Sequence, residues 1–446
     1  ALTDSGIGAA TLSANLEDNN ITLATIEAGT DAGDIHVDAA VSWNADHTLS
    51  LKAHNDIHIN QAITATNGGL TLDAVGAISA DGAVHVDTFN LQRGAWSQLG
   101  SSLANFSAGD FRLNTANASF LRANGGDGSE GNAYQIFDLF GLQGIASRSL
   151  LSRHFALSND IDASGTANWN GGAGFVPIGD NANRYTGSFD GQGHIINDLT
   201  IDRPGTNDVG LFGVISASQI SNIDLQNASV NGQFQVGGLV GRGLNSSQIS
   251  HSAVMGDLIG KFDVGGLVGA LNGSIETSHS SGTVDGSDYP VGGLVGAMTG
   301  QISDSYSTAT VTGNKDVGGL VGKMNGSIDR SFATGNVKDT GGLSNTGGLV
   351  GDFEGSIDDS YASGTVQSRG ATSDGGAGGL VGRSLGTITA SHASGTVIGN
   401  DTTGGLVGRI ISGDINQSYA SGQVQGNESV GGLVGINGGG AINQSH

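Results

Sequence analysis

The sequence Gly-Gly-Leu-Val-Gly occurs eight times in the second half of this 446-residue chain. The copies recur at nearly even intervals, and they begin at Gly237, Gly265, Gly292, Gly318, Gly347, Gly378, Gly404 and Gly431. A fixed period of this kind is typical of chains that are built from stacked copies of one small unit. The repeat therefore favours a solenoid and disfavours a compact enzyme fold.

Each unit contains three short apolar runs, and glycine closes each run. One unit begins at Gly347 and ends its third run at Val366. Three runs predict three strands and three turns per coil, and such units stack as a parallel β-helix with about 4.8 Å between coils. Glycine suits the corners because it tolerates positive φ and close approach of another chain segment. We therefore predict an all-β fold with about three short strands per coil.

The chain divides into three segments by pattern. Residues 1–93 hold short alternating strands whose similar starts at Leu49, Leu70 and Phe89 recur at a shorter interval, which indicates a second, looser repeat. Residues 94–208 are irregular, with glycine-rich loops and a helix-like spacing over 142–151. Residues 209–446 form the strict array, which stops part-way through a repeat, and we expect the chain to be a segment of a longer protein.

The alternation of strand side chains predicts an outward ladder. If Val366 points inward, then Ser360 and Ala362 share its face of the strand, and Tyr361 and Thr365 point outward. The position of Tyr361 holds an aromatic ring or an imidazole in the other units, at His279, Tyr306, Phe332, His392, Tyr419 and His446. Exposed rings suit sugar faces, so this ladder is one candidate ligand-binding surface, and the loops of residues 94–208 are the other. The alternative is that the rings stack on one another and stabilise the solenoid.

Charge and composition limit the partners, covalent links and catalytic groups that the chain can have. The chain has 17 basic and 41 acidic residues, a net charge of −24, which makes nucleic acid and anionic lipid poor partners. The absence of cysteine excludes disulfides, Cys-ligated zinc and thiol catalysis. No apolar run is long enough to span a membrane as a helix. The acidity serves solubility or divalent-cation binding, and the acidic loop with Asp127 and Glu130 is the calcium candidate. We predict no other metal or cofactor.

Carboxylates that could cleave a polysaccharide are the alternative to a binding role. The candidate residues are Asp160, Asp162, Asp190, His194, Asp358 and Asp359. The adjacent Asp358 and Asp359 point to opposite faces of a strand, so they cannot act on one bond. Their equivalents in other units vary, for example Glu276 and Thr277 or Thr389 and Ala390. We therefore predict that the chain is not an enzyme.

The array resembles the GLUG motif of secreted and surface bacterial proteins. The eight copies carry this resemblance, together with the Gly-Ser-Ile and Ser-Tyr-Ala-Ser-Gly-Thr-Val sequences that follow them. The first half is similar to the haemagglutinin-type repeats of filamentous-haemagglutinin-like, two-partner-secreted adhesins, as seen in residues 49–59, 69–74, 159–164 and 189–194. The resemblance implies a right-handed β-helix on the surface of a Gram-negative cell, exported by an outer-membrane secretion partner.

The expected function is that of a segment of a large secreted or cell-surface adhesin. It would mediate attachment, aggregation or biofilm formation by binding exopolysaccharide, a host-surface glycan or a host protein. Two alternatives remain open, a polysaccharide-degrading β-helix enzyme and a purely structural stalk. The enzyme requires a carboxylate cluster on adjacent coils, and the stalk requires no ligand.

Overall fold

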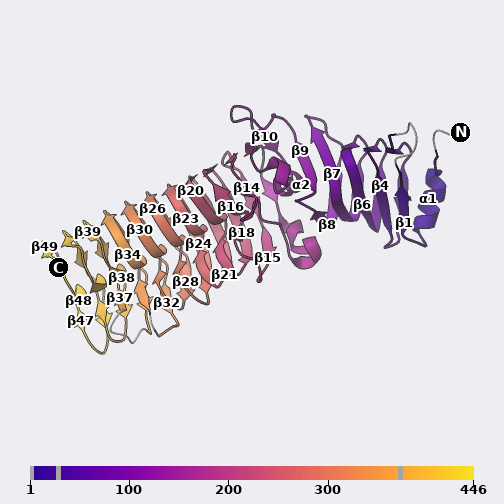
Figure 1. The fold of residues 1–446 in the computed structure, drawn as a ribbon. Coiled ribbons are helices and arrows are strands. Elements are labelled where there is room, and N and C mark those ends of the chain that lie inside the picture. The colour runs from indigo at the N-terminus through magenta and orange to yellow at the C-terminus, as the bar shows by residue number, and fades with distance from the viewer. Residues whose placement is uncertain (1–4, 27–31, 343, 370–374) are drawn as a thin grey trace. The chain divides into compact units, whose positions relative to one another are not determined.

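The computed structural model describes residues 5–26, 32–342, 344–369 and 375–446. Strands account for 54% of the chain and helices for 6%, and parallel strands stack coil upon coil, which confirms the predicted β-solenoid class. The chain forms two compact units, Ala1–Ile178 and Gly179–His446 (Figure 1). The division into the segments 1–93, 94–208 and 209–446 remains a prediction.

The first unit is a solenoid of short coils preceded by a helix. Helix α1 (Ala9–Leu16) buries Leu12 and Leu16. The strands that follow are β1 (Ile21–Ala24), β2 (Ile35–Val37), β3 (Val41–Trp43), β4 (Thr48–Ala53), β5 (Ile57–Ile59), β6 (Ile63–Ala80), β7 (Val84–Leu99), β8 (Phe106–Leu113) and β9 (Ala118–Ala123). Leu49 pairs with Leu70, and Leu70 pairs with Phe89, which confirms the predicted looser repeat.

The remainder of the first unit is irregular. It comprises β10 (Tyr134–Ile136), α2 (Leu139–Gly144), a 3-10 turn (Arg148–Leu150), β11 (Phe155–Leu157), β12 (Ile161–Asp162) and a second 3-10 segment (Ser164–Gly172). Helix α2 begins at Leu139 because the Asp138 carboxylate accepts a hydrogen bond of 2.8 Å from the Gly141 amide. The helical segment therefore starts earlier than the predicted 142–151 and continues as a 3-10 turn.

Three parallel sheets form the second unit, which confirms three strands per coil (Figure 1). The first sheet contains β13 (Ser188–Asp190), β16 (Phe212–Ser216), β17 (Gln219–Ser221), β20 (Val240–Ser250), β23 (Val268–Glu276), β26 (Val295–Ser303), β30 (Val321–Asp329), β34 (Val350–Asp358), β38 (Val381–Ser384), β39 (Thr387–Thr389), β43 (Val407–Ile410), β44 (Ile415–Asn416), β48 (Val434–Asn437) and β49 (Ile442–Asn443). The fourth residue of each Gly-Gly-Leu-Val-Gly copy pairs with its equivalent, as in Val295 with Val321.

The other two sheets complete each coil. The second contains β14 (Ile195–Asn197), β15 (Thr200–Asp202), β18 (Asp224–Asn231), β21 (Ala253–Gly260), β24 (His279–Gly286), β27 (Tyr306–Ser307), β28 (Thr310–Gly313), β31 (Phe332–Ala333), β32 (Val337–Asp339), β35 (Tyr361–Ala362), β36 (Val366–Gln367), β40 (His392–Ala393), β41 (Val397–Ile398), β45 (Tyr419–Ala420) and β46 (Val424–Gln425). The third contains β19 (Phe234–Gly237), β22 (Phe262–Gly265), β25 (Val291–Gly292), β29 (Val317–Gly318), β33 (Asn345–Gly347), β37 (Gly376–Gly378), β42 (Thr403–Gly404) and β47 (Val430–Gly431).

Glycine in the repeat permits close approach of neighbouring coils. None of the glycines in the eight copies has a positive φ. A Cβ atom on Gly319 would lie 2.1 Å from the carbonyl oxygen of Gly348, its equivalent in the next coil. Positive φ occurs at other glycines of the array, such as Gly300 and Gly326. It also occurs at a corner occupied by other residue types, with φ between 43° and 50° at Thr277, Asp304, Arg330, Asp359, Ala390, Gln417 and Gln444.

A buried serine follows this corner in each coil from Ser278 to Ser418 and joins that coil to the next one. The Ser305 amide donates to Ser331 Oγ at 3.2 Å, and the Ser331 amide donates to Ser360 Oγ at 3.1 Å. Ser331 Oγ in turn donates to the Asp329 carbonyl oxygen at 2.8 Å. Ser360, Ala362 and Val366 are all buried, which confirms the predicted inward face of this strand.

Candidate functional site

The predicted aromatic ladder forms as one continuous stack in the second unit. Its ring centroids are 4.6 to 5.7 Å apart, and its interplanar angles lie between 1° and 15°. The rings in order are His279, Tyr306, Phe332, Tyr361, His392, Tyr419 and His446. Register explains the stack, because the ring residues from His279 to Tyr419 pair directly with their equivalents in the next coil, as Tyr306 pairs with Phe332.

Stacking covers the ring faces and leaves the ring edges toward solvent. The interior rings are half-buried, whereas Tyr419 is exposed. Burial lowers the pKa of His279 below its ordinary value of 6.5, and the Asp224 carboxylate opposes that shift. Burial also lowers the pKa of His392, against the opposing charge of Asp359. A sugar that stacks on an aromatic face needs that face free, so a ligand at the middle of the ladder could contact only ring edges, the Tyr hydroxyls and the imidazole nitrogens.

An open polar hollow lies on the first unit, at a corner of the coils. Its volume is about 550 Å³, and its lining residues are Asp73, Asn90, Gln92, Arg93, Asn114 and Asn117. Arg93 Nε donates to Asp73 Oδ1 at 2.7 Å. Every lining side chain carries a hydrogen-bonding group, so the hollow can hold a ligand that is rich in hydroxyl groups.

A β-bulge presents these side chains. Leu72 of β6 pairs with Leu91 of β7, but Asp73 pairs with Arg93, so Gln92 is an extra residue in β7. Bulges commonly redirect side chains next to functional sites. The adjoining turn, which joins β8 to β9, is closed by the Asn117 amide donating to the Asn114 carbonyl at 3.1 Å. Sequence reasoning did not identify this hollow, because the bulge is visible only once the strands are paired.

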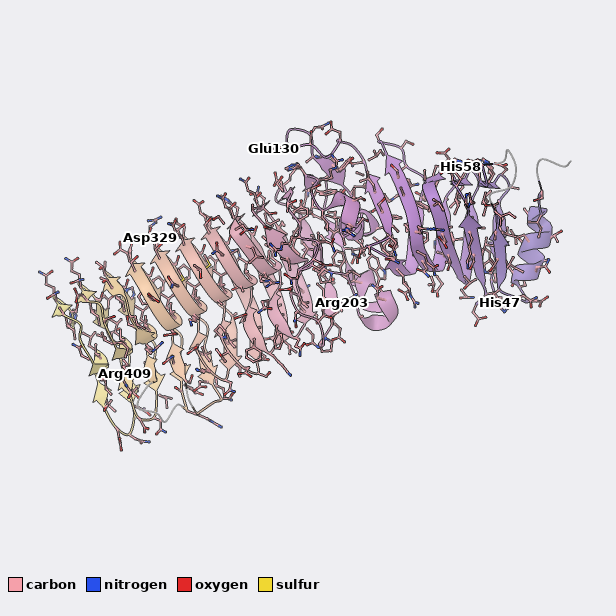
Figure 2. All side chains as sticks on the ribbon, in the orientation of Figure 1. His47, His58, Glu130, Arg203, Asp329 and Arg409 are labelled. Atoms are coloured by element: carbon pink, nitrogen blue, oxygen red, sulfur yellow. The ribbon has the colours of Figure 1, made fainter. Side chains whose placement is uncertain are left out.

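The structure places the two calcium candidates on one exposed loop of the first unit, where Figure 2 labels Glu130. The Asp127 carboxylate accepts a hydrogen bond of 2.9 Å from the Ser129 amide and so closes the turn. Hydrogen bonds from Ser129 and Asn132 lower the pKa of Asp127. Calcium needs six to eight oxygen ligands, and calcium binding at Asp127 and Glu130 stays a prediction.

Most of the carboxylates that were considered as candidate catalytic groups accept hydrogen bonds that close turns. Asp190 Oδ1 accepts hydrogen bonds from the Gln192 amide at 2.9 Å and from Asn222 Nδ2 at 2.8 Å. Asp162 Oδ1 accepts from the Ser164 amide at 2.9 Å, and Asp359 lies at the corner with φ of 43°. These roles are structural ones, and the prediction that the chain is not an enzyme rests on the sequence argument.

Buried carboxylates and the side chains that bond them form a polar row inside the array. Arg383 donates to both carboxylate oxygens of Asp352, at 2.8 and 3.1 Å, and Asn345 Nδ2 donates to Asp316 Oδ1 at 2.7 Å. Burial raises the pKa of Asp316, and the nearby Asp352 charge adds to the shift. Because these carboxylates are bonded to neighbouring side chains, we interpret them as links between coils.

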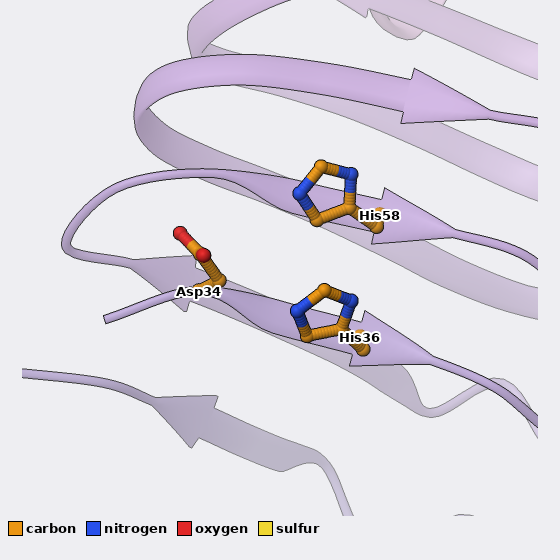
Figure 3. A group of neighbouring side chains, drawn as sticks. All are labelled: Asp34, His36 and His58. Carbon is orange, nitrogen blue, oxygen red and sulfur yellow. The ribbon is translucent and has the colours of Figure 1, made fainter. Parts of the chain in front are cut away.

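A cluster of one carboxylate and two imidazoles lies near the start of the first unit. Among the described residues, Asp34, His36 and His58 bring three potential metal-ligand atoms within 4.8 Å of one another (Figure 3). A backbone hydrogen bond from Asp56 is the main cause that lowers the pKa of Asp34, and burial opposes it. Sequence reasoning missed this cluster, although the similar sequences Ile35-His36-Val37 and Ile57-His58-Ile59 recur at an interval close to the period of the looser repeat.

Comparison with known proteins identifies one motif and two partial relatives. The family model described as the GLUG motif matches residues 289–312, which confirms that motif within the array. Halomucin of Haloquadratum walsbyi is 44% identical over 123 residues, or 26% of this chain and 1% of that protein. A protein of Evansella cellulosilytica, named as a Gly-rich membrane protein, is 37% identical over 110 residues, or 25% of this chain and 12% of that protein. The matched stretches thus span a small part of either relative.

A solved structure from Bacteroides ovatus, named as an immunoglobulin A1 protease, is 21% identical with a TM-score of 0.40, over 71% of this chain and 86% of that one. In the part of the chain that the structure describes, no helix has both the length and the apolar character needed to cross a membrane.

Proposed function

We propose that this chain is a segment of a large surface-associated protein that mediates attachment by binding polysaccharide. The GLUG motif and the names of the two partial relatives support a place at the cell surface. The observation that carries the binding role is the hollow lined by Asp73, Asn90, Gln92, Arg93, Asn114 and Asn117.

The chemistry of the hollow favours neutral sugars. Amide side chains donate and accept at once, which matches the paired hydroxyl groups of a pyranose ring. The Arg93 guanidinium is already bonded to Asp73, so it is partly neutralised as an anion-binding group. The net charge of −24 further disfavours acidic polysaccharide through long-range repulsion. Neutral exopolysaccharide or a neutral host glycan is therefore the proposed ligand.

A glycan array probed with the 446-residue chain, with and without calcium, tests this proposal. We expect neutral glycans to bind, and we expect the double variant Asn90→Ala with Asn117→Ala to lose at least about 10-fold in affinity, the loss of about 1.4 kcal/mol of hydrogen bonding. The matched control is Asn105→Ala, at an exposed asparagine of the same unit outside the hollow. Equal binding by the double variant and the control would refute the assignment to the hollow, and release of shortened glycan would support the enzyme alternative.

The ladder carries a second candidate function, that of a structural stalk. Its rings cover one another's faces, as expected if the stack stabilises the solenoid. Replacing Tyr306, Tyr361 and Tyr419 with serine separates the two roles. A stalk predicts a lower unfolding midpoint and unchanged glycan binding. Loss of glycan binding at an unchanged midpoint would instead assign ligand contact to the ring edges.

The finer features of the predicted adhesin follow from the family resemblance. They are a position on the outer surface of a Gram-negative bacterium, export by an outer-membrane partner, and a role in aggregation or biofilm formation. Deleting the segment from the native protein and measuring cell aggregation tests them. Aggregation that is unchanged by the deletion would remove this segment from the adhesive function.

A further inference from the structure

We propose that Asp34, His36 and His58 form a binding site for a divalent transition-metal ion, with zinc as the probe. The site is independent of the polysaccharide proposal. It belongs to the first unit, where the looser repeat brings equivalent residues of neighbouring coils together.

Strand register places the two histidines side by side. Ile35, His36 and Val37 of β2 pair with Ile57, His58 and Ile59 of β5. The flanking aliphatic side chains are buried, so both imidazoles point to the outer face of the coil. The two rings stack with their centroids 4.7 Å apart and an interplanar angle of 17°.

Asp34 completes the cluster from the turn that precedes β2. Figure 3 shows its carboxylate on the side toward which one nitrogen of each ring points, and the ligand atoms of all three residues lie within 4.8 Å of one another. Asp34 Oδ1 accepts hydrogen bonds from Asn55 Nδ2 at 2.8 Å and from the Asp56 amide at 3.0 Å. These bonds hold the carboxylate in place, and we assign its Oδ2 to the metal.

A hydrogen bond also orients one imidazole. His58 Nδ1 lies 2.9 Å from the hydroxyl oxygen of Ser79, the paired residue in the following coil. This contact leaves Nε2 of His58 as the nitrogen for a metal. Residues that bond the second nitrogen of a ligating histidine fix its orientation, and their loss typically weakens metal binding about 10- to 100-fold. Ser79 is therefore a positioning residue of the proposed site.

The ligand set selects the class of ion. Two imidazole nitrogens and one carboxylate oxygen suit zinc, which takes three protein ligands and a water molecule at open sites. Ligand atoms around a tetrahedral zinc are about 3.4 Å apart, so the three atoms must draw together by up to about 1.4 Å. Side-chain rotation supplies that movement at a surface site. Calcium prefers a shell made wholly of oxygen and should not compete, whereas copper should bind more tightly than zinc.

Titration calorimetry of the chelator-treated 446-residue chain with zinc chloride tests the site. We expect one zinc ion per chain, undisturbed by excess calcium, and a loss of affinity above about 10-fold in each of the variants Asp34→Asn, His36→Gln and His58→Gln. The matched control is His85→Gln, at an exposed histidine of the same unit whose Nδ1 also contacts a serine hydroxyl, that of Ser107. Circular dichroism verifies that each variant is folded.

Two results would overturn the proposal. One is zinc affinity in folded His36→Gln and His58→Gln that equals the affinity of the control. The other needs no variant: the electron paramagnetic resonance spectrum of the copper-loaded native chain should show two equivalent imidazole nitrogens, and a spectrum with oxygen ligands alone would contradict the site. A Ser79→Ala variant that binds zinc about 10-fold more weakly would confirm the positioning role.

Discussion

Replacing Gly319 with alanine is the sharpest test of why the repeat needs glycine. Gly319 is the second glycine of its Gly-Gly-Leu-Val-Gly copy, and its φ is not positive, so backbone preference does not explain the residue. An added Cβ atom would lie 2.1 Å from the Gly348 carbonyl oxygen and 3.0 Å from the Ala333 Cβ atom. The nearest contact is with backbone, so a side-chain rotation cannot relieve it.

The expected loss of stability follows from the distance by which the two coils must move apart. Restoring an ordinary contact of about 3.2 Å requires the coils to move apart by about 1 Å. That movement weakens the hydrogen bonds from the Gly319 amide to the Gly347 carbonyl, at 3.2 Å, and from the Leu320 amide to the Leu349 carbonyl, at 2.9 Å. Overpacking costs about 1–3 kcal/mol, and each lost hydrogen bond costs about 1 kcal/mol. We therefore expect the free energy of unfolding to fall by about 3–5 kcal/mol.

The last copy of the repeat provides the matched control. Gly432 occupies the same position as Gly319, but no described atom lies within 4 Å of a Cβ atom placed there. Solenoid coils can unfold in sections, so chemical denaturation should be combined with hydrogen exchange of the amides in residues 318–350. Gly319→Ala should speed that exchange, while Gly432→Ala should not. Indistinguishable unfolding free energies for the two variants would refute the close-approach explanation.

Two further predictions concern the rows of residues that join the coils. Ser331→Ala removes a hydroxyl that accepts a hydrogen bond from the neighbouring coil and donates one within its own coil. We therefore expect the free energy of unfolding, measured by denaturant titration, to fall by about 2 kcal/mol. Ser363→Ala, at an exposed serine, should have a negligible effect. Burial lowers the folded-state pKa of His279 and His392 below 6.5, so the unfolded chain binds more protons than the folded chain as the pH falls through 6.5. The thermal unfolding midpoint should therefore decrease as the pH is lowered below 6.5. The double variant to glutamine should show a flatter dependence on pH, and identical profiles would contradict this assignment.

Periodicity and alternation predicted those features of the array that recur in every coil. Val366 is buried, so strict alternation predicts that Ser360 is buried too and that Tyr361 points outward, and the structure has both. The stacking distance of the ladder also follows from the sequence, because parallel in-register strands repeat at about 4.8 Å. Such features need only a count of residues between equivalent positions.

The remaining features depend on contacts that alternation does not encode. The residues at the positive-φ corner have no common side chain, as Thr277, Arg330 and Ala390 show, so composition does not reveal that conformation. The polar hollow requires the bulge at Gln92, which shifts the pairing of β6 and β7 by one residue. The cluster with His36 requires the register between two short strands whose flanking sequences differ.

The two ring stacks show how one backbone arrangement can serve stability or binding. His279 stacks on Tyr306 with centroids 4.6 Å apart, and His36 stacks on His58 at 4.7 Å, so strand register is the same device in both units. The neighbours of the rings differ. The stack with an aromatic neighbour offers one half-buried imidazole, whereas the His36–His58 pair offers two imidazoles beside the Asp34 carboxylate. In both units strand register brings the rings together, and the residues beside the ring pair decide whether the stack also presents a set of potential metal ligands.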